Sequence, residues 1–73
     1  MKPEEIKPDT WYVNTDGARC YIEEIEGEGS EAHVMYHYFG CPSTMKSLES
    51  LAWMLVREIP APPPSPKMIK RNR

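Results

Sequence analysis

The sequence predicts a single small, mostly β domain with one short helical segment near its C-terminal end. The chain has 73 residues, enough for one hydrophobic core. Segments rich in Tyr, Val, Ile, Phe and Trp alternate with Gly- and Pro-containing breakers, as is typical of short strands joined by turns. After residue 43 the apolar residues change from the spacing of a strand to the spacing of a helix.

Three strand-like segments precede the change of period. The first, TWYVN, ends at the turn TDG, and the glycine-bearing stretch GEGS makes the second and third a hairpin. In the third segment both faces carry aromatic residues, so alternation leaves open which face is buried. The three segments span residues 10–14, 18–26 and 31–39.

The hairpin raises the question of a metal site or a catalytic pair. A turn centred within GEGS would pair Cys20 with His37 and Glu24 with His33, which puts all four side chains on one face. Zinc sites usually include two cysteines a few residues apart, and the two histidines, four residues apart in a strand, would lie about 13 Å apart. A nucleophilic cysteine also needs a group that orients its base. We therefore expect no metal, no cofactor and no catalytic residue.

The segment 43–59 contains the expected helix. Apolar residues at i, i+3, i+4 and i+7 form one helical face over 48–55, and Ser47 is placed to cap the first turn. VREI at 56–59 then closes the sheet as a last strand, or the helix continues to Arg57. The sequence leaves both readings open.

The two tryptophans are expected to differ in burial. Trp53 lies off the apolar helical face, whereas Trp11 lies in the first strand-like segment. We expect Trp11 to be the more buried of the two.

A short strand with Trp11 is followed by a glycine turn, a long acidic hairpin and then MKSLESLAWMLVREI. The order of these segments resembles that of the small SH3-like barrels, including Tudor-like and KOW-like modules. The pattern over 10–59 is especially similar to short proteins of bacteriophages and prophages. The resemblance implies an SH3-like barrel of about five short strands with one short helix or 3-10 turn. Residues 1–9 are expected to form an N-terminal arm, and 60–73 a disordered, Pro-rich basic tail. Such barrels bind proteins, RNA or DNA.

Charge is distributed unevenly along the chain. Residues 1–66 hold five basic and eleven acidic residues, a net charge of −6, whereas 67–73 hold four basic residues and no acid. Because an acidic body repels phosphate, we expect a non-enzymatic protein-interaction module whose partner has a basic surface. The resemblance implies a phage or prophage accessory protein that binds and modulates a host protein. The residues expected to bind are Tyr36, His37, Tyr38, Glu24, Glu26 and Glu28.

The alternative function is nucleic-acid binding by the same small domain. A Trp or Tyr would stack on bases, and the basic tail would contact phosphates. The tail residues concerned are Lys67, Lys70, Arg71 and Arg73.

Length and composition narrow the remaining classes. A ligand-enclosing pocket of roughly 300–1,000 Å³ is difficult to accommodate in so small a core, which argues against an enzyme acting as a monomer. No apolar run approaches the roughly 20 residues of a membrane span and the N-terminus lacks a signal sequence, so we expect a cytoplasmic protein. Cys20 and Cys41 are expected as reduced, packed thiols. A homodimer stays open, because dimerisation would enlarge the core.

Overall fold

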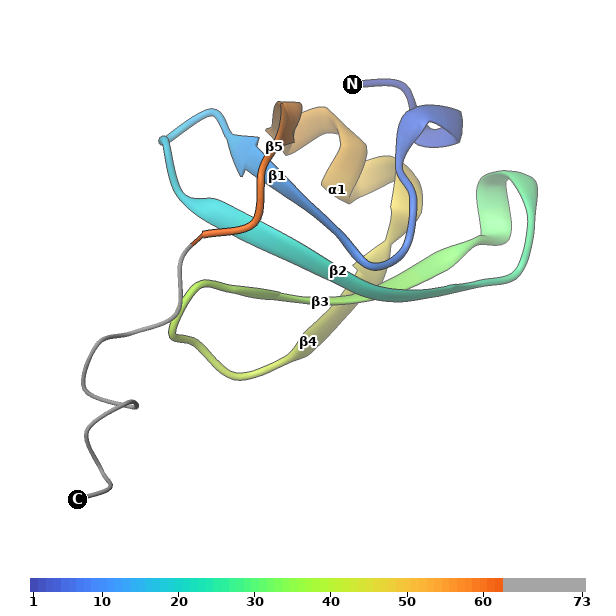
Figure 1. Cartoon of the computed structure of the whole chain (residues 1–73). Coiled ribbons are helices and arrows are strands. Elements are labelled where there is room, and N and C mark those ends of the chain that lie inside the picture. The colour runs from blue at the N-terminus through green and yellow to red at the C-terminus, as the bar shows by residue number, and fades with distance from the viewer. Residues whose placement is uncertain (63–73) are drawn as a thin grey trace, which may run out of the picture.

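The computed structural model describes residues 1–62 and contains one antiparallel five-stranded sheet, in the order β4-β3-β2-β1-β5, with one short α-helix (Figure 1). The prediction of a mostly β fold with about five strands and one helix is confirmed. Of the predicted basic tail, 60–73, residues 63–73 lie outside the part of the chain that the structure describes. The elements are η1 (Pro3–Glu5), β1 (Thr10–Asn14), β2 (Arg19–Glu26), η2 (Gly29–Glu31), β3 (His33–Tyr38), β4 (Thr44–Ser47), α1 (Leu48–Met54) and β5 (Leu55–Ile59).

The core lies on one face of the sheet, which we call the inner face. Tyr12, Ile22 and Val34 on this face are 0% exposed, and Leu51 of α1 packs into the same cluster. Each fully buried large side chain contributes roughly 1.5–3 kcal/mol relative to its exposed state. The complete cluster consists of Ile6, Tyr12, Cys20, Ile22, Ala32, Val34, Tyr36, Leu48, Leu51, Ala52 and Leu55.

The N-terminal segment, expected to form an arm, packs beside α1 (Figure 1). Ile6 is 5% exposed and belongs to the core. The Tyr12 hydroxyl accepts a hydrogen bond from the Lys7 N–H at 2.9 Å and donates to the Glu5 carbonyl at 3.3 Å. These contacts give a buried hydroxyl the partners that it needs inside the protein.

The turn between β1 and β2 is organised by one buried polar side chain. Asn14 is 6% exposed, and its Oδ1 accepts from the N–H groups of Asp16 and Ala18 at 2.9 and 2.8 Å. Its Nδ2 donates to the Tyr38 hydroxyl at 3.4 Å. Gly17 has a φ of 85°, which a residue without Cβ adopts at little cost. Asn14 thus faces inward because the turn uses its amide.

The β2–β3 hairpin corrects the predicted register. Cys20 pairs with Tyr38, and Tyr21 pairs with His37, so the expected pairing of Cys20 with His37 is wrong. The loop after β2 contains the 3-10 turn η2 instead of a tight turn centred in GEGS, and a bulge at Glu23 shifts the register again. A slip of one residue moves a side chain to the other face of the sheet. Cys20 and His37 therefore lie on opposite faces.

The segment with helical spacing divides into three elements. Thr44–Ser47 forms β4, because the apolar helical repeat begins only at Leu48. The Ser47 side chain caps α1 by accepting from the Ser50 N–H at 3.2 Å, as predicted. The helix ends at Met54, so the reading of a helical turn followed by a closing strand is correct. No helix within the described part of the chain is long and apolar enough to cross a membrane.

The two cysteines are both free thiols, but they differ in environment. Cys20 is buried in the core, whereas Cys41 is exposed in the loop between β3 and β4. The prediction of a packed thiol is wrong for Cys41, because it directly follows the turn residue Gly40 (φ 82°).

Candidate functional site

The face of the sheet turned away from the core, which we call the outer face, carries a line of large side chains across four strands. Trp11 pairs with Ile59 on one side and with Tyr21 on the other, and Tyr21 pairs with His37. Residues paired in this way point to the same face. We call these four residues, Ile59, Trp11, Tyr21 and His37, the aromatic row.

The rings of the aromatic row touch one another. The ring centroids of Trp11 and Tyr21 are 5.1 Å apart, and those of Tyr21 and His37 are 5.4 Å apart. Phe39, directly after β3, adds a fourth ring at 5.9 Å from Trp11 and is 46% exposed. Contacts at these distances contribute about 0.5–1.5 kcal/mol per pair. The result is a continuous aromatic surface that stays partly open to solvent.

Carboxylates hold two of these rings in place. The Tyr21 hydroxyl donates to Asp9 Oδ1, which raises the pKa of Tyr21. His37 Nδ1 lies 2.6 Å from Glu23 Oε2, and the Ser43 hydroxyl donates to the same oxygen. The hydrogen bonds from Ser43 and then from His37 lower the pKa of the Glu23 carboxyl. The orientation of both rings is therefore set before any partner arrives.

The outer face carries opposite charges on the two sides of the aromatic row. On one side, which we call the basic end, Val13 pairs with both Arg19 and Arg57, and the Arg19 guanidinium lies 4.7 Å from the centre of the Phe39 ring. On the other side, β2 continues past the row into its glutamates. This acidic end consists of Asp9, Glu23, Glu24 and Glu26.

The predicted binding residues do not all lie on the outer face. His37 does, but Tyr36 points inward and is 4% exposed, and Tyr38 packs against the core beside Asn14. The three glutamates predicted to bind are exposed, two on the acidic end and one in the hairpin loop: Glu24, Glu26 and Glu28. The predicted nucleic-acid contacts Lys67, Lys70, Arg71 and Arg73 lie outside the described residues.

The residues that sequence reasoning left out are those brought together by the correct register: Trp11, Tyr21, Phe39 and Glu23. One signal for that register was present in the sequence. Ile22 and Ile25 are separated by two glutamates instead of one, which breaks the period of two expected for a strand with one buried face. Such a break is the signature of a bulge, and the bulge is at Glu23.

The side chains that the predicted hairpin register would have gathered on one face are not brought together. Among residues 1–62, no group of three or more His, Cys, Asp or Glu side chains is placed to hold a metal ion. Burial raises the pKa of the Cys20 thiol to about 11, so the thiol is protonated at neutral pH. His37 is on the other face, so it does not serve as a base for Cys20.

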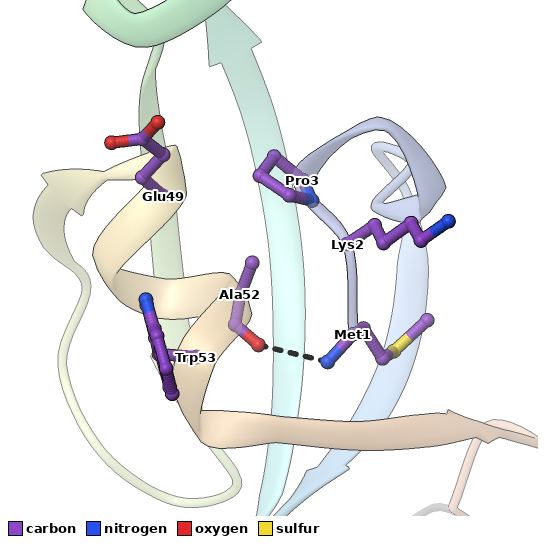
Figure 2. Close-up of a pocket in the computed structure, with 6 residues that line it drawn as sticks. All are labelled: Met1, Lys2, Pro3, Glu49, Ala52 and Trp53. Atoms are coloured by element: carbon purple, nitrogen blue, oxygen red, sulfur yellow. Dashed lines mark hydrogen bonds between the residues drawn. The ribbon is translucent and has the colours of Figure 1, made fainter.

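Apart from the outer face, the molecule has a cleft between the N-terminal segment and α1, which we call the α1 cleft (Figure 2). The cleft has a volume of about 630 Å³. Trp53 on its rim is 85% exposed, whereas Trp11 is half-buried, so the prediction that Trp11 is the more buried tryptophan is confirmed. The Met1 amino group donates to the carbonyls of Ala52 and Leu55 at 3.0 and 2.9 Å. The cleft is lined by Met1, Lys2, Pro3, Glu49, Ala52 and Trp53.

No protein-family model, curated protein or solved structure matches this chain. The residues of the outer face therefore carry the functional proposal on their own.

Proposed function

We propose that this protein is a non-enzymatic protein-interaction module that binds its partner through the outer face. The observation that carries the proposal is the set of four rings, three in the aromatic row and Phe39, that touch one another and stay partly exposed. Trp, Tyr and Arg dominate the binding energy of protein interfaces, and Trp11, Tyr21 and Arg19 lie on this one face. Exposed aromatic surface of this kind is typical of an interaction site.

The fixed orientation of the rings supports the same proposal. Asp9 and Glu23 already hold Tyr21 and His37 in the free protein. A partner that docks on these rings pays little conformational entropy to order them. The carboxylates that orient the rings also give the acidic end its charge, which favours a partner with a basic surface.

The wider context of the proposal is an SH3-like barrel of phage or prophage origin that acts on a host protein in the cytoplasm. The strand order β4-β3-β2-β1-β5 and the helical turn α1 between β4 and β5 support the SH3-like assignment. The phage origin rests on the resemblance of the sequence pattern over residues 10–59. Fold alone does not determine the partner, so the outer face is the part to test.

The test is an affinity pull-down from bacterial lysate, with and without nuclease, followed by mass spectrometry. The baits are the full-length protein, Trp11→Ala, and Trp53→Ala as a matched tryptophan control in the α1 cleft. We expect one bacterial protein to be recovered regardless of nuclease, lost with Trp11→Ala and retained with Trp53→Ala. Equal recovery with all three baits would contradict the proposal.

Single-stranded nucleic acid is the second candidate, and one observation favours it. Rings on three neighbouring strands, with Arg19 stacked on Phe39, resemble the platforms on which bases stack. The net charge of −6 over residues 1–66 opposes it. Recovery that disappears with nuclease, together with binding of a labelled oligonucleotide at physiological salt, would favour this candidate over the leading one.

A further inference from the structure

We propose that the outer face also binds a second copy of itself, in a symmetric dimer whose two-fold axis follows the aromatic row. This inference rests on the proposed function, because it names one partner for the same face. It follows from the positions of the charged residues on either side of that row.

The charges lie at matched distances from the aromatic row. Along β2, Arg19 is two residues before Tyr21 and Glu23 is two residues after it. At about 3.4 Å per residue, each lies about 7 Å from the row, on opposite sides. On the neighbouring chain segment, Val13 is two residues after Trp11 in β1. Asp9 precedes β1 at a bend with a φ of 56°, and its place on the acidic side of the row is fixed by the hydrogen bond from the Tyr21 hydroxyl and by its own N–H, which donates to the Ile22 carbonyl at 2.7 Å.

A two-fold axis in the plane of an interface brings each residue against the one at the mirrored position in the other copy. With the axis along the aromatic row, Arg19 meets Glu23 of the second copy, and Glu23 meets its Arg19. Val13, which has Arg57 beside it, meets Asp9 of the second copy. The rings on the axis meet their own counterparts. Opposite charges therefore face each other on both sides of an aromatic centre.

The charged groups concerned have capacity left for such contacts. Within residues 1–62 the only ion pairs are Lys7 with Glu58 and His37 with Glu23, so Arg19 makes none there. In the same range, Glu23 uses Oε2 and Asp9 uses Oδ1 for hydrogen bonds. The second oxygen of each carboxylate has no hydrogen bond there, and a guanidinium is a strong donor to such an oxygen.

The size of the face predicts a weak dimer. Along β2, the face extends about 14 Å from Arg19 to Glu23. Across the sheet, the four strands span about 14 Å, because neighbouring strands lie about 4.8 Å apart. The footprint of this face, about 14 Å by 14 Å, is therefore about 200 Å², which is smaller than the roughly 800 Å² that each partner buries in an interface of standard size. We therefore expect a dissociation constant of roughly 10 µM to 1 mM.

The experiment is sedimentation velocity on the full-length protein at concentrations from about 10 µM to 1 mM. In Arg19→Glu, like charges meet twice per dimer, so we expect the dissociation constant to rise about tenfold or more. The double variant Arg19→Glu/Glu23→Arg restores opposite charges but removes the carboxylate that orients His37. We therefore expect it to self-associate at least about threefold more tightly than Arg19→Glu, without reaching the original affinity. An equimolar mixture of Arg19→Glu and Glu23→Arg should also associate. Lys2→Glu, the matched charge reversal in the α1 cleft, should change nothing.

Three outcomes would overturn the dimer. The first is a full-length protein that stays monomeric at about 1 mM, because even the weakest dissociation constant in the expected range would put about half of the chains in dimers at that concentration. The second is self-association that Arg19→Glu leaves unchanged or that the double variant fails to strengthen relative to Arg19→Glu. The third is self-association that survives Arg19→Glu and is lost when the four tail cations are changed to Gln: Lys67, Lys70, Arg71 and Arg73.

Failure of the dimer and failure of the proposed function give different results. A monomeric protein that still captures a bacterial protein through Trp11 would refute the dimer alone. Capture that persists with Trp11→Ala would refute the proposed function, while sedimentation reports on self-association without any lysate component. The two experiments therefore test the two proposals separately.

Discussion

The inner and outer faces of the sheet both carry aromatic rings, but the polar atoms of these rings have different partners. On the inner face Tyr12 is fully buried, and its hydroxyl bonds to the backbone of residues 5 and 7. On the outer face Tyr21 and His37 bond to carboxylate side chains and remain partly exposed. The inner ring is therefore fixed by folding of the whole chain, and the outer rings by neighbours on the same surface.

This difference separates stability from binding. A buried hydroxyl without partners costs free energy, so Tyr12 requires the N-terminal segment to be packed. The outer rings need only Asp9 and Glu23, and their exposed surface stays available to a partner. We therefore expect inner substitutions to change mainly the free energy of unfolding, and outer substitutions to change mainly binding.

The largest expected effect is that of Tyr12→Ala. Loss of a fully buried ring should cost about 3–5 kcal/mol, which is comparable with the whole stability of a domain this small. Urea unfolding followed by circular dichroism measures the loss. Tyr12→Phe removes only the hydroxyl and should cost about 1–2 kcal/mol. A loss below about 1 kcal/mol for Tyr12→Ala would place Tyr12 outside the core.

Trp11→Ala should have an intermediate effect on stability and a large effect on binding. The side chain is half-buried on the outer face, so the expected loss is that of its contacts with Tyr21, His37 and Phe39, about 2 kcal/mol. The same urea series measures it beside Tyr12→Ala. A loss equal to that of Tyr12→Ala would mean that the two faces do not differ as described.

Glu23→Gln tests the carboxylate that orients His37. Because hydrogen bonds lower the folded-state pKa of Glu23, its contribution is present above the ordinary pKa of Glu and is lost as pH falls through the lowered value. The stability difference between the original protein and Glu23→Gln should be largest near neutral pH and shrink in acid. Thermal unfolding from about pH 7 to 3 measures this difference. Glu28→Gln in the hairpin loop is the control, and a difference independent of pH would contradict the assignment.

Trp53→Ala should have the smallest effect. Its side chain is 85% exposed, so the free energy of unfolding should change by about 0.5 kcal/mol or less. Partner capture should be unchanged, because the residue lies at the α1 cleft and not on the outer face. Loss of capture with a folded Trp53→Ala protein would move the binding site to the α1 cleft.

Much of the fold could be predicted from local patterns. Aromatic and β-branched residues identified the long strands, and the period of 3.6 identified α1 with its Ser47 cap. The strand β4 was missed because four residues, TMKS, hold too little alternation to distinguish a strand from the start of a helix. The hairpin register was missed because the bulge at Glu23 and the turn η2 add residues that the length of GEGS does not reveal.

The site was harder to predict because β1 reverses the usual pattern of burial. Hydrophobicity alone would bury Trp11 and Val13 and expose Tyr12 and Asn14. The structure instead buries Tyr12 and Asn14 and leaves Trp11 and Val13 half-buried, because Asn14 organises the β1–β2 turn and the N-terminal segment supplies partners for the Tyr12 hydroxyl. The turn and the N-terminal segment both lie outside β1, so the alternation of residues within the strand does not reveal their effect on burial.

The contrast between the two thiols provides an intrinsic reporter of conformational opening. Cys41 is exposed and open to an alkylating reagent in the folded state, whereas Cys20, the second residue of β2, is 0% exposed and has a pKa of about 11. Modification of Cys20 therefore requires the sheet to separate, and its rate reports the free energy of that event. Intact-mass spectra of singly and doubly alkylated protein would follow it over time without any engineered probe.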